Sequence, residues 1–166
     1  MNNKIIVIAD DIRSSHNVGS LLRTCEGLGI EKVYLSGYTP YPISKNDNRL
    51  PHLAKRVTKR ILKTSLGAEE FIDWEHIDNT YGAIKDLKAK GYQIVAVELT
   101  KDAIALNDFK MPRKVVFIFG NERTGISSKL LKSVDKIVCI PMLGHKESFN
   151  VVQSVAMVLY AARFIN

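Results

Sequence analysis

Apolar and polar residues alternate along the chain in blocks, and the blocks predict strands that are separated by helices. Five short runs are apolar on both faces, which is typical of parallel strands that helices cover on both sides. These runs predict strands at 4–9, 32–37, 93–99, 114–119 and 136–140, and a weaker pattern indicates a sixth at 69–74. Helical spacing of apolar residues predicts helices at 17–28, 79–90, 128–134 and from 151 onward.

Turn-forming residues mark where some of these elements begin and end. Asn17 is predicted to cap the first helix, and Gly29 to end it. Prolines and asparagines make residues 38–50 a long loop. Residues 51–65 fit two descriptions, a basic helix or a loop with helical turns.

Strands that alternate with helices predict an α/β fold with a parallel sheet and helices on both faces. The 166 residues, of which 46% are hydrophobic, suffice for the core of a single domain over 1–166. No apolar run approaches the ~20 residues of a membrane span. The first residues lack a signal-peptide pattern, so a cytoplasmic protein is expected. Cys25 and Cys139 match no metal-site spacing, and no metal is expected.

The net charge of +7 is concentrated in one segment. Residues 45–63 hold seven cations and only one acidic residue, Asp47. Such a segment fits a solvated surface helix, and it equally fits a face that binds nucleic-acid phosphates. On the second interpretation, the expected RNA contacts are Arg13, Lys45, Arg49, Lys55, Arg56, Lys59 and Arg60.

Ligands of parallel sheets bind at the carboxyl ends of the strands, and polar loops follow three predicted strands there. The first loop opens the helix at 17–28 with the pattern N-x-G-x-x-x-R, which contains Asn17, Gly19 and Arg23. Leucines crowd around Arg23, so its stem is expected to be buried and its guanidinium to face a cleft.

The second loop, FGNERTG, follows the strand at 114–119 and places Glu122 at a strand end. Its spacing fits neither a phosphate-binding loop nor a dinucleotide fingerprint. The third loop, IPMLGHKESFN, precedes the last helix, which Asn150 is predicted to cap together with Gln153. That helix is apolar almost all round, which predicts that it packs on the sheet and on a second subunit.

Taken in order, the three segments resemble the three motifs of the SPOUT methyltransferases. They are most similar to those of the TrmH (SpoU) family of RNA ribose 2′-O-methyltransferases. The resemblance spans Asp10 to Tyr160. It implies a C-terminal deep trefoil knot, S-adenosylmethionine as cofactor, a homodimer through the C-terminal helix with an active site drawn from both subunits, and a tRNA or rRNA substrate.

The resemblance also implies which residues form the site. The catalytic group would comprise Asn17, Arg23, Glu122, Ser148 and Asn150. The cofactor would be bound by Glu98, Leu99, Gly120, Ile140, Met142 and Ser148.

A ribose 2′-hydroxyl is a poor nucleophile until its proton is removed or its charge is stabilised. The family proposal gives this task to Arg23, but a guanidinium with a pKa above ~12 is a weak base. Stabilisation of the developing alkoxide, or a clamp on a phosphate, is the better physical role. Two other functions remain open: a non-catalytic RNA-binding protein, and a small-molecule enzyme, which the basic segment disfavours.

Overall fold

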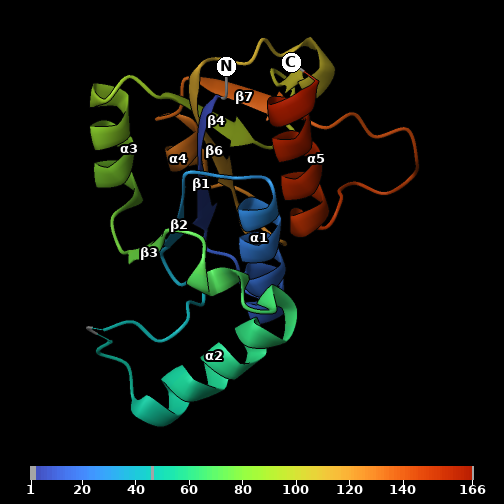
Figure 1. Cartoon of the computed structure of the whole chain (residues 1–166). Coiled ribbons are helices and arrows are strands. Elements are labelled where there is room, and N and C mark those ends of the chain that lie inside the picture. The colour runs from blue at the N-terminus through green and yellow to red at the C-terminus, as the bar shows by residue number, and fades with distance from the viewer. Residues whose placement is uncertain (1–2, 46, 166) are drawn as a thin grey trace.

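The structure, a computed structural model, describes residues 3–45 and 47–165 (Figure 1). The strands are β1 (Lys4–Asp10), β2 (Lys32–Ser36), β3 (Trp74–Ile77), β4 (Gln93–Val97), β5 (Ile104–Ala105), β6 (Lys114–Phe119) and β7 (Lys136–Cys139). The α-helices are α1 (Ser15–Gly27), α2 (Pro51–Ser65), α3 (Thr80–Ala89), α4 (Ser128–Leu131) and α5 (Val151–Phe164). Single 3₁₀ turns, η1 (Ala68–Glu70) and η2 (Leu106–Asp108), complete the assignment.

The strands form one seven-stranded sheet in the order β3-β2-β1-β6-β4-β7-β5. Every neighbouring pair is parallel, so the carboxyl ends of all seven strands lie along one edge. In the middle of the sheet, Val7 of β1 is level with Phe117 of β6, which is level with Val95 of β4. The predicted α/β fold with a parallel sheet is therefore confirmed.

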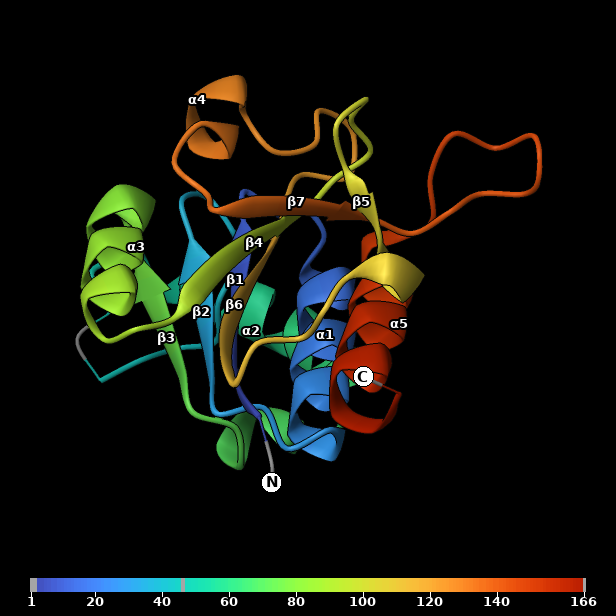
Figure 2. The same ribbon diagram turned by 90° about the horizontal axis from the view of Figure 1, so that it is seen from above.

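Helices cover both faces of the sheet, as predicted (Figures 1 and 2). One core lies under α1 and α5, where Leu21 and Leu159 are fully buried, and α2 packs against α1. The other core lies under α3 and α4 and includes Ile84 and Leu130. The two cores explain why the central strands are apolar on both faces.

Both ends of α5 are fastened to the rest of the chain. At its start, the Asn150 side chain accepts from the backbone and Gln153 reaches back to the Asn150 N–H, which is the predicted capping box. Near its end, the Arg163 guanidinium donates to the carbonyls of Leu28 (2.9 Å), Asn3 (2.5 Å) and Gly29. These bonds join α5 to the end of α1 and to the residue that precedes β1.

Several predicted boundaries are wrong for local reasons. The strand expected at 69–74 is mostly the turn η1 and its exit, because Gly67 adopts a positive φ and the chain extends only from Trp74. The helix expected at 128–134 ends at Leu131. The strand β5 was not predicted, because two residues leave no periodic pattern. The segment 51–65 is a regular helix, with Pro51 at its first position.

None of the helices in the described part of the chain has the length and apolar character that a membrane span requires.

Candidate cofactor and RNA site

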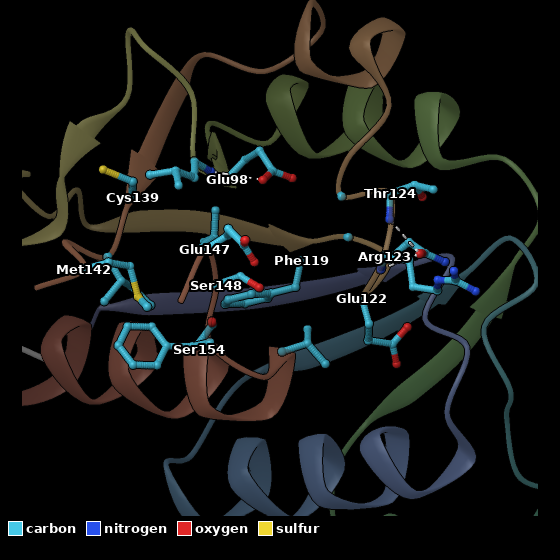
Figure 3. Close-up of a pocket in the computed structure, with 18 residues that line it drawn as sticks. Glu98, Phe119, Glu122, Arg123, Thr124, Cys139, Met142, Glu147, Ser148 and Ser154 are labelled. Carbon is cyan, nitrogen blue, oxygen red and sulfur yellow. Dashed lines mark hydrogen bonds between the residues drawn. The ribbon is translucent and has the colours of Figure 1, made fainter. Parts of the chain in front are cut away.

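A cavity of about 310 Å³ opens where three loops meet at the carboxyl ends of β4, β6 and β7 (Figure 3). That volume lies at the lower end of the ~300–1,000 Å³ of typical small-molecule pockets. One wall follows β4, a second follows β6, and the third comes from the 141–150 loop and the start of α5. The cavity is lined by each residue that the sequence assigned to the cofactor: Glu98, Leu99, Gly120, Ile140, Met142 and Ser148.

The lining combines apolar walls with an excess of negative charge. Three carboxylates line it, those of Glu98, Glu122 and Glu147, against the single guanidinium of Arg123. Three negative charges less one positive charge leave a formal excess of two. Apolar side chains such as those of Phe119 and Met142 face the same space (Figure 3). The cavity therefore suits a ligand with a flat apolar part and a cationic part.

Glu98 ties two walls of the cavity together. Its carboxylate accepts hydrogen bonds from the backbone N–H of Leu99 at 3.0 Å and of Ile126 at 2.8 Å. The loop after β6 passes so close that a Cβ at Gly125 would lie 2.4 Å from Glu98 Oε2. Gly125 also has a φ of +66°, which favours glycine. Glu98 thus holds the second loop close to the carboxyl end of β4.

Glu122 joins the first loop to the second. Its carboxylate accepts from the backbone N–H of Arg13 at 2.9 Å and of Ser14 at 3.2 Å, and from the Asn17 amide at 2.8 Å. Partial burial would raise the pKa of Glu122, but these hydrogen bonds outweigh it and hold the pKa below its ordinary value. The predicted N-cap role of Asn17 is wrong: Ser14 caps α1, and the Asn17 amide serves Glu122 instead.

Asn121, which the sequence analysis did not select, is the most buried polar residue of the second loop, with 6% of its surface exposed. Its Oδ1 accepts from the backbone N–H of Arg123 and Thr124, at 2.8 and 3.0 Å. Its Nδ2 donates to the Asp11 carbonyl at 2.9 Å and to the Tyr38 hydroxyl at 2.7 Å. Its position between Gly120 and Glu122, which the sequence analysis assigned to the site, could have identified it as a site residue.

The third loop contributes Ser148 to the cavity, whereas Asn150 is occupied by the cap of α5. Residues 141–150 are exposed apart from the half-buried Met142, and the loop extends away from the sheet (Figure 2). Cys139 is half-buried and lines the cavity. It ends β7, and the last residue of a parallel strand lies at the edge where ligands bind.

Arg23 lies elsewhere in this chain, and the predicted burial of its stem is wrong. Leu21, Leu22 and Cys25 occupy the side of α1 that packs on the sheet, so the side chain of Arg23 falls on the exposed side. Among the described residues that line the cavity, Glu122 and Ser148 are present and Arg23 is not. Glu122 bonds Asn17 and backbone N–H groups rather than Arg23.

The basic segment forms an exposed face on α2, which projects from the body of the molecule (Figure 1). Its exposed cations are Lys55, Arg56, Lys59, Arg60 and Lys63. Lys45 and Arg13 are exposed as well. Arg49 differs, because it bonds the Asp47 carboxylate and the Tyr41 carbonyl and lies 3.5 Å above the Tyr41 ring. It orders the loop that leads into α2.

A comparison with protein families places these residues in a known framework. The model of the SpoU rRNA Methylase family matches residues 4–160, which is nearly the whole chain. The chain belongs to the SpoU methylase family. The resemblance inferred from the three sequence motifs is confirmed, and with it the family's assignment as methyltransferase enzymes.

Two curated relatives are similar over almost all of this SpoU family chain, and both are named tRNA (guanosine(18)-2′-O)-methyltransferase. The protein of Aquifex aeolicus is 28% identical over 96% of this chain and 68% of its own length. That of Borreliella burgdorferi is 31% identical over 96% of this chain and 66% of its own length. The chain thus spans about two thirds of the length of these relatives.

A solved structure confirms the fold. The AdoMet-bound rRNA methyltransferase of Sinorhizobium meliloti superposes with a TM-score of 0.82 over 98% of this chain and 56% of that chain, at 23% identity. At that identity the likeness shows the shared fold. The Sinorhizobium enzyme was solved with AdoMet bound, and AdoMet is S-adenosylmethionine.

No group of three or more metal-binding side chains gathers anywhere in residues 3–45 and 47–165.

Proposed function

We propose that this SpoU family chain transfers a methyl group from S-adenosylmethionine to a ribose 2′-hydroxyl of tRNA or rRNA. The observation that carries the proposal is that the second and third loops, which are remote in sequence, meet the end of β4 around one cavity at the carboxyl edge of the sheet. The family match and the names of the relatives support the reaction.

The cavity fits this cofactor by its charge and its walls. S-adenosylmethionine carries a sulfonium and an ammonium against one carboxylate, so a lining with two excess negative charges favours it. The apolar walls near Ile140 and Met142 suit the adenine. Bound there, the cofactor supplies an electrophilic methyl carbon. The β7–α5 connection around it would form the deep trefoil knot that the family resemblance implies.

The residues of this chain would then position the nucleophile. Methyl transfer is an in-line displacement, so placing the 2′-oxygen opposite the methyl carbon supplies much of the rate. Glu122 holds the amide of Asn17 and the first turn of α1 in place. Ser148 lines the cavity where the sugar would approach, and Asn150 fixes the end of that loop through its cap.

Arg23 would act across a dimer. In a single chain it is exposed on α1, away from the cavity lining, while α5 presents Tyr160 and Phe164 to solvent with 54% and 66% exposure. The two rings pack with their centroids 5.0 Å apart and form an exposed apolar surface that a second copy of the chain can cover. Arg23 of the partner subunit then stabilises the developing alkoxide or an adjacent phosphate.

RNA would dock along the exposed cations of α2 and the adjoining loop. The exposed surface of α2 carries four of these cations, Lys55, Arg56, Lys59 and Arg60. Each contact that they make with a phosphate would release counterions from the RNA. Arg49 is already held by Asp47, so we expect it to support the loop more than to bind a phosphate.

The Arg23→Ala variant tests the catalytic assignment. We expect it to lose RNA methylation while it keeps its affinity for S-adenosylmethionine, because Arg23 is outside the lining of the cavity in its own chain. Calorimetry measures cofactor binding, and mass-spectrometric mapping of 2′-O-methyl sites in tRNA and rRNA, with and without the gene, measures activity. Wild-type turnover in the variant would contradict the role of Arg23. A wild-type chain that binds RNA and not the cofactor would instead be an RNA-binding protein.

A further inference from the structure

Tyr38 is an exposed aromatic residue that is held at both ends. It follows β2, and 62% of its surface is accessible. Its backbone N–H donates to Asp11 Oδ1 at 3.0 Å, and its hydroxyl accepts from Asn121 Nδ2 at 2.7 Å. An exposed tyrosine is ordinarily free to change rotamer, whereas here the bonds at the hydroxyl and at the backbone hold the side chain in one direction.

The backbone around Tyr38 is arranged to keep this geometry. Asp11, which receives the Tyr38 N–H, has a φ of +55°, a conformation that non-glycine residues rarely adopt. Gly37, just before Tyr38, has a φ of +64°, and a Cβ there would lie 2.1 Å from Asp11 Oδ1. Strained backbone of this kind persists where the surrounding structure enforces it, often at binding sites.

The anchor of the ring belongs to the cavity wall. Asn121, which bonds the Tyr38 hydroxyl, lines the cavity between Gly120 and Glu122. Arg13, whose N–H bonds Glu122, and Arg123 both carry exposed side chains. An anchored aromatic side chain and two arginines thus come from the segments that surround the carboxylate of Glu122, which holds Asn17.

We propose that the ring of Tyr38 is a stacking platform for a base of the substrate RNA, next to the ribose that is methylated, with Arg13 and Arg123 on the flanking phosphates. Bases that are out of a helical stack are bound on aromatic faces, and a fixed ring loses little freedom on stacking. The inference rests on the proposed function, because it names how the same site holds its RNA.

The test compares Tyr38→Leu, which removes the ring, with Tyr38→Phe, which removes only the hydroxyl. Phe71→Leu is the matched control, because Phe71 is 79% exposed but precedes β3 and so lies toward the amino ends of the strands, the opposite edge of the sheet. Filter binding with unfractionated tRNA and with rRNA gives the RNA affinity, and calorimetry gives the affinity for S-adenosylmethionine.

We expect Tyr38→Leu to weaken binding of the preferred RNA roughly tenfold, within the range seen when a stacking aromatic is removed. Tyr38→Phe should keep most of the affinity, Phe71→Leu should keep all of it, and cofactor affinity should be the same in every variant. Equal RNA affinity of Tyr38→Leu and wild type would overturn the proposal. So would a loss in Tyr38→Phe as large as in Tyr38→Leu, or a Tyr38→Leu chain that loses affinity because it changes oligomeric state in sedimentation.

Failure of the proposed function gives a different result. If the wild-type chain transfers no methyl group yet binds RNA through Tyr38, the proposed methyl transfer is wrong and the stacking role of Tyr38 stands. If the wild-type chain is active but its RNA affinity does not depend on Tyr38, the stacking role is wrong and the proposed methyl transfer stands.

Discussion

Single residues at this site make contacts that their sequence neighbours do not reveal. Glu122 is the clearest case, because one carboxylate receives two backbone N–H groups and the Asn17 amide. Partial burial of Glu122 disfavours its charged form, but these hydrogen bonds stabilise the charged form more strongly. The pKa of Glu122 is therefore lowered from 4.5. A group whose pKa falls on folding stabilises the fold above its unfolded pKa, and that contribution is lost as the pH falls through its folded pKa.

The Glu122→Gln variant should therefore be less stable than wild type at pH 7, and the difference should shrink in acid. Glutamine keeps an acceptor but removes the charge that strengthens the bonds to Arg13, Ser14 and Asn17. Urea unfolding measured between pH 7 and about pH 3, a range that spans the ordinary glutamate pKa, checks this expectation. Glu26→Gln, an exposed position on α1, is the control. A stability difference that is constant with pH would show that the charge of Glu122 contributes nothing.

At the scale of elements, α1 is the central support of the site. It carries Asn17 and Arg23, and it packs against both α2 and α5. The close approach of α1 and α2 depends on Gly19, where a Cβ would lie 2.2 Å from the Ile61 carbonyl oxygen and 2.2 Å from Thr64 Oγ1. The glycine in the motif N-x-G-x-x-x-R thus allows the basic helix to pack against α1.

Two glycine substitutions in this one helix should have opposite effects. Gly19→Ala forces α2 to move and should lower the free energy of unfolding by about 1–3 kcal/mol, the usual cost of overpacking. Gly27→Ala has open space around its Cβ, and it should be neutral or stabilise by up to about 1 kcal/mol through higher helix propensity. Thermal or urea unfolding measures both. If Gly19→Ala leaves the free energy of unfolding unchanged, α1 and α2 can move apart without loss of stability, and the prediction is wrong.

At the scale of the whole molecule, one chain does not bring all the residues of the proposed catalytic group to the cavity. The cavity collects the second and third motifs, whereas Arg23 of the first motif is exposed on α1. The exposed rings of Tyr160 and Phe164 give α5 a surface for a second copy. Activity should therefore depend on the dimer.

Co-expression of two inactive subunits tests this dependence. Gly120→Val should distort the second loop, which lines the cavity, because a Cβ at Gly120 would lie 2.7 Å from the carbonyl carbon of Gly125. A heterodimer of Arg23→Ala with Gly120→Val should regain methylation, since the second subunit supplies Arg23 to the intact cavity of the first. Each homodimer is the control. Lack of recovery in a purified heterodimer would contradict the supply of Arg23 by the second subunit.

The sequence predicted five of the seven strands and the cofactor residues that line the cavity, and the reasons differ by residue. Strands such as β1 and β6 are buried on both faces, so an apolar run identifies them. The exposure of Arg23 was not predicted, because leucines close in sequence do not show that Leu21, Leu22 and Cys25 take the side of α1 that faces the sheet. The N-cap was wrong because a local pattern cannot choose between Ser14 and Asn17, which are three positions apart. Asn121 was missed because its bonds to Asp11 and Tyr38 join segments that are remote in sequence.

The way α5 is fastened has a consequence for how a ligand reaches the cavity. The helix is anchored at its first turn by Asn150 and Gln153, along its length by buried residues such as Val155, and at its last turn by Arg163. The preceding strand is anchored by its pairing with β4 and β5. We therefore expect any rearrangement on ligand binding to be confined to the exposed loop between β7 and Asn150, while the outward face of α5 keeps its position.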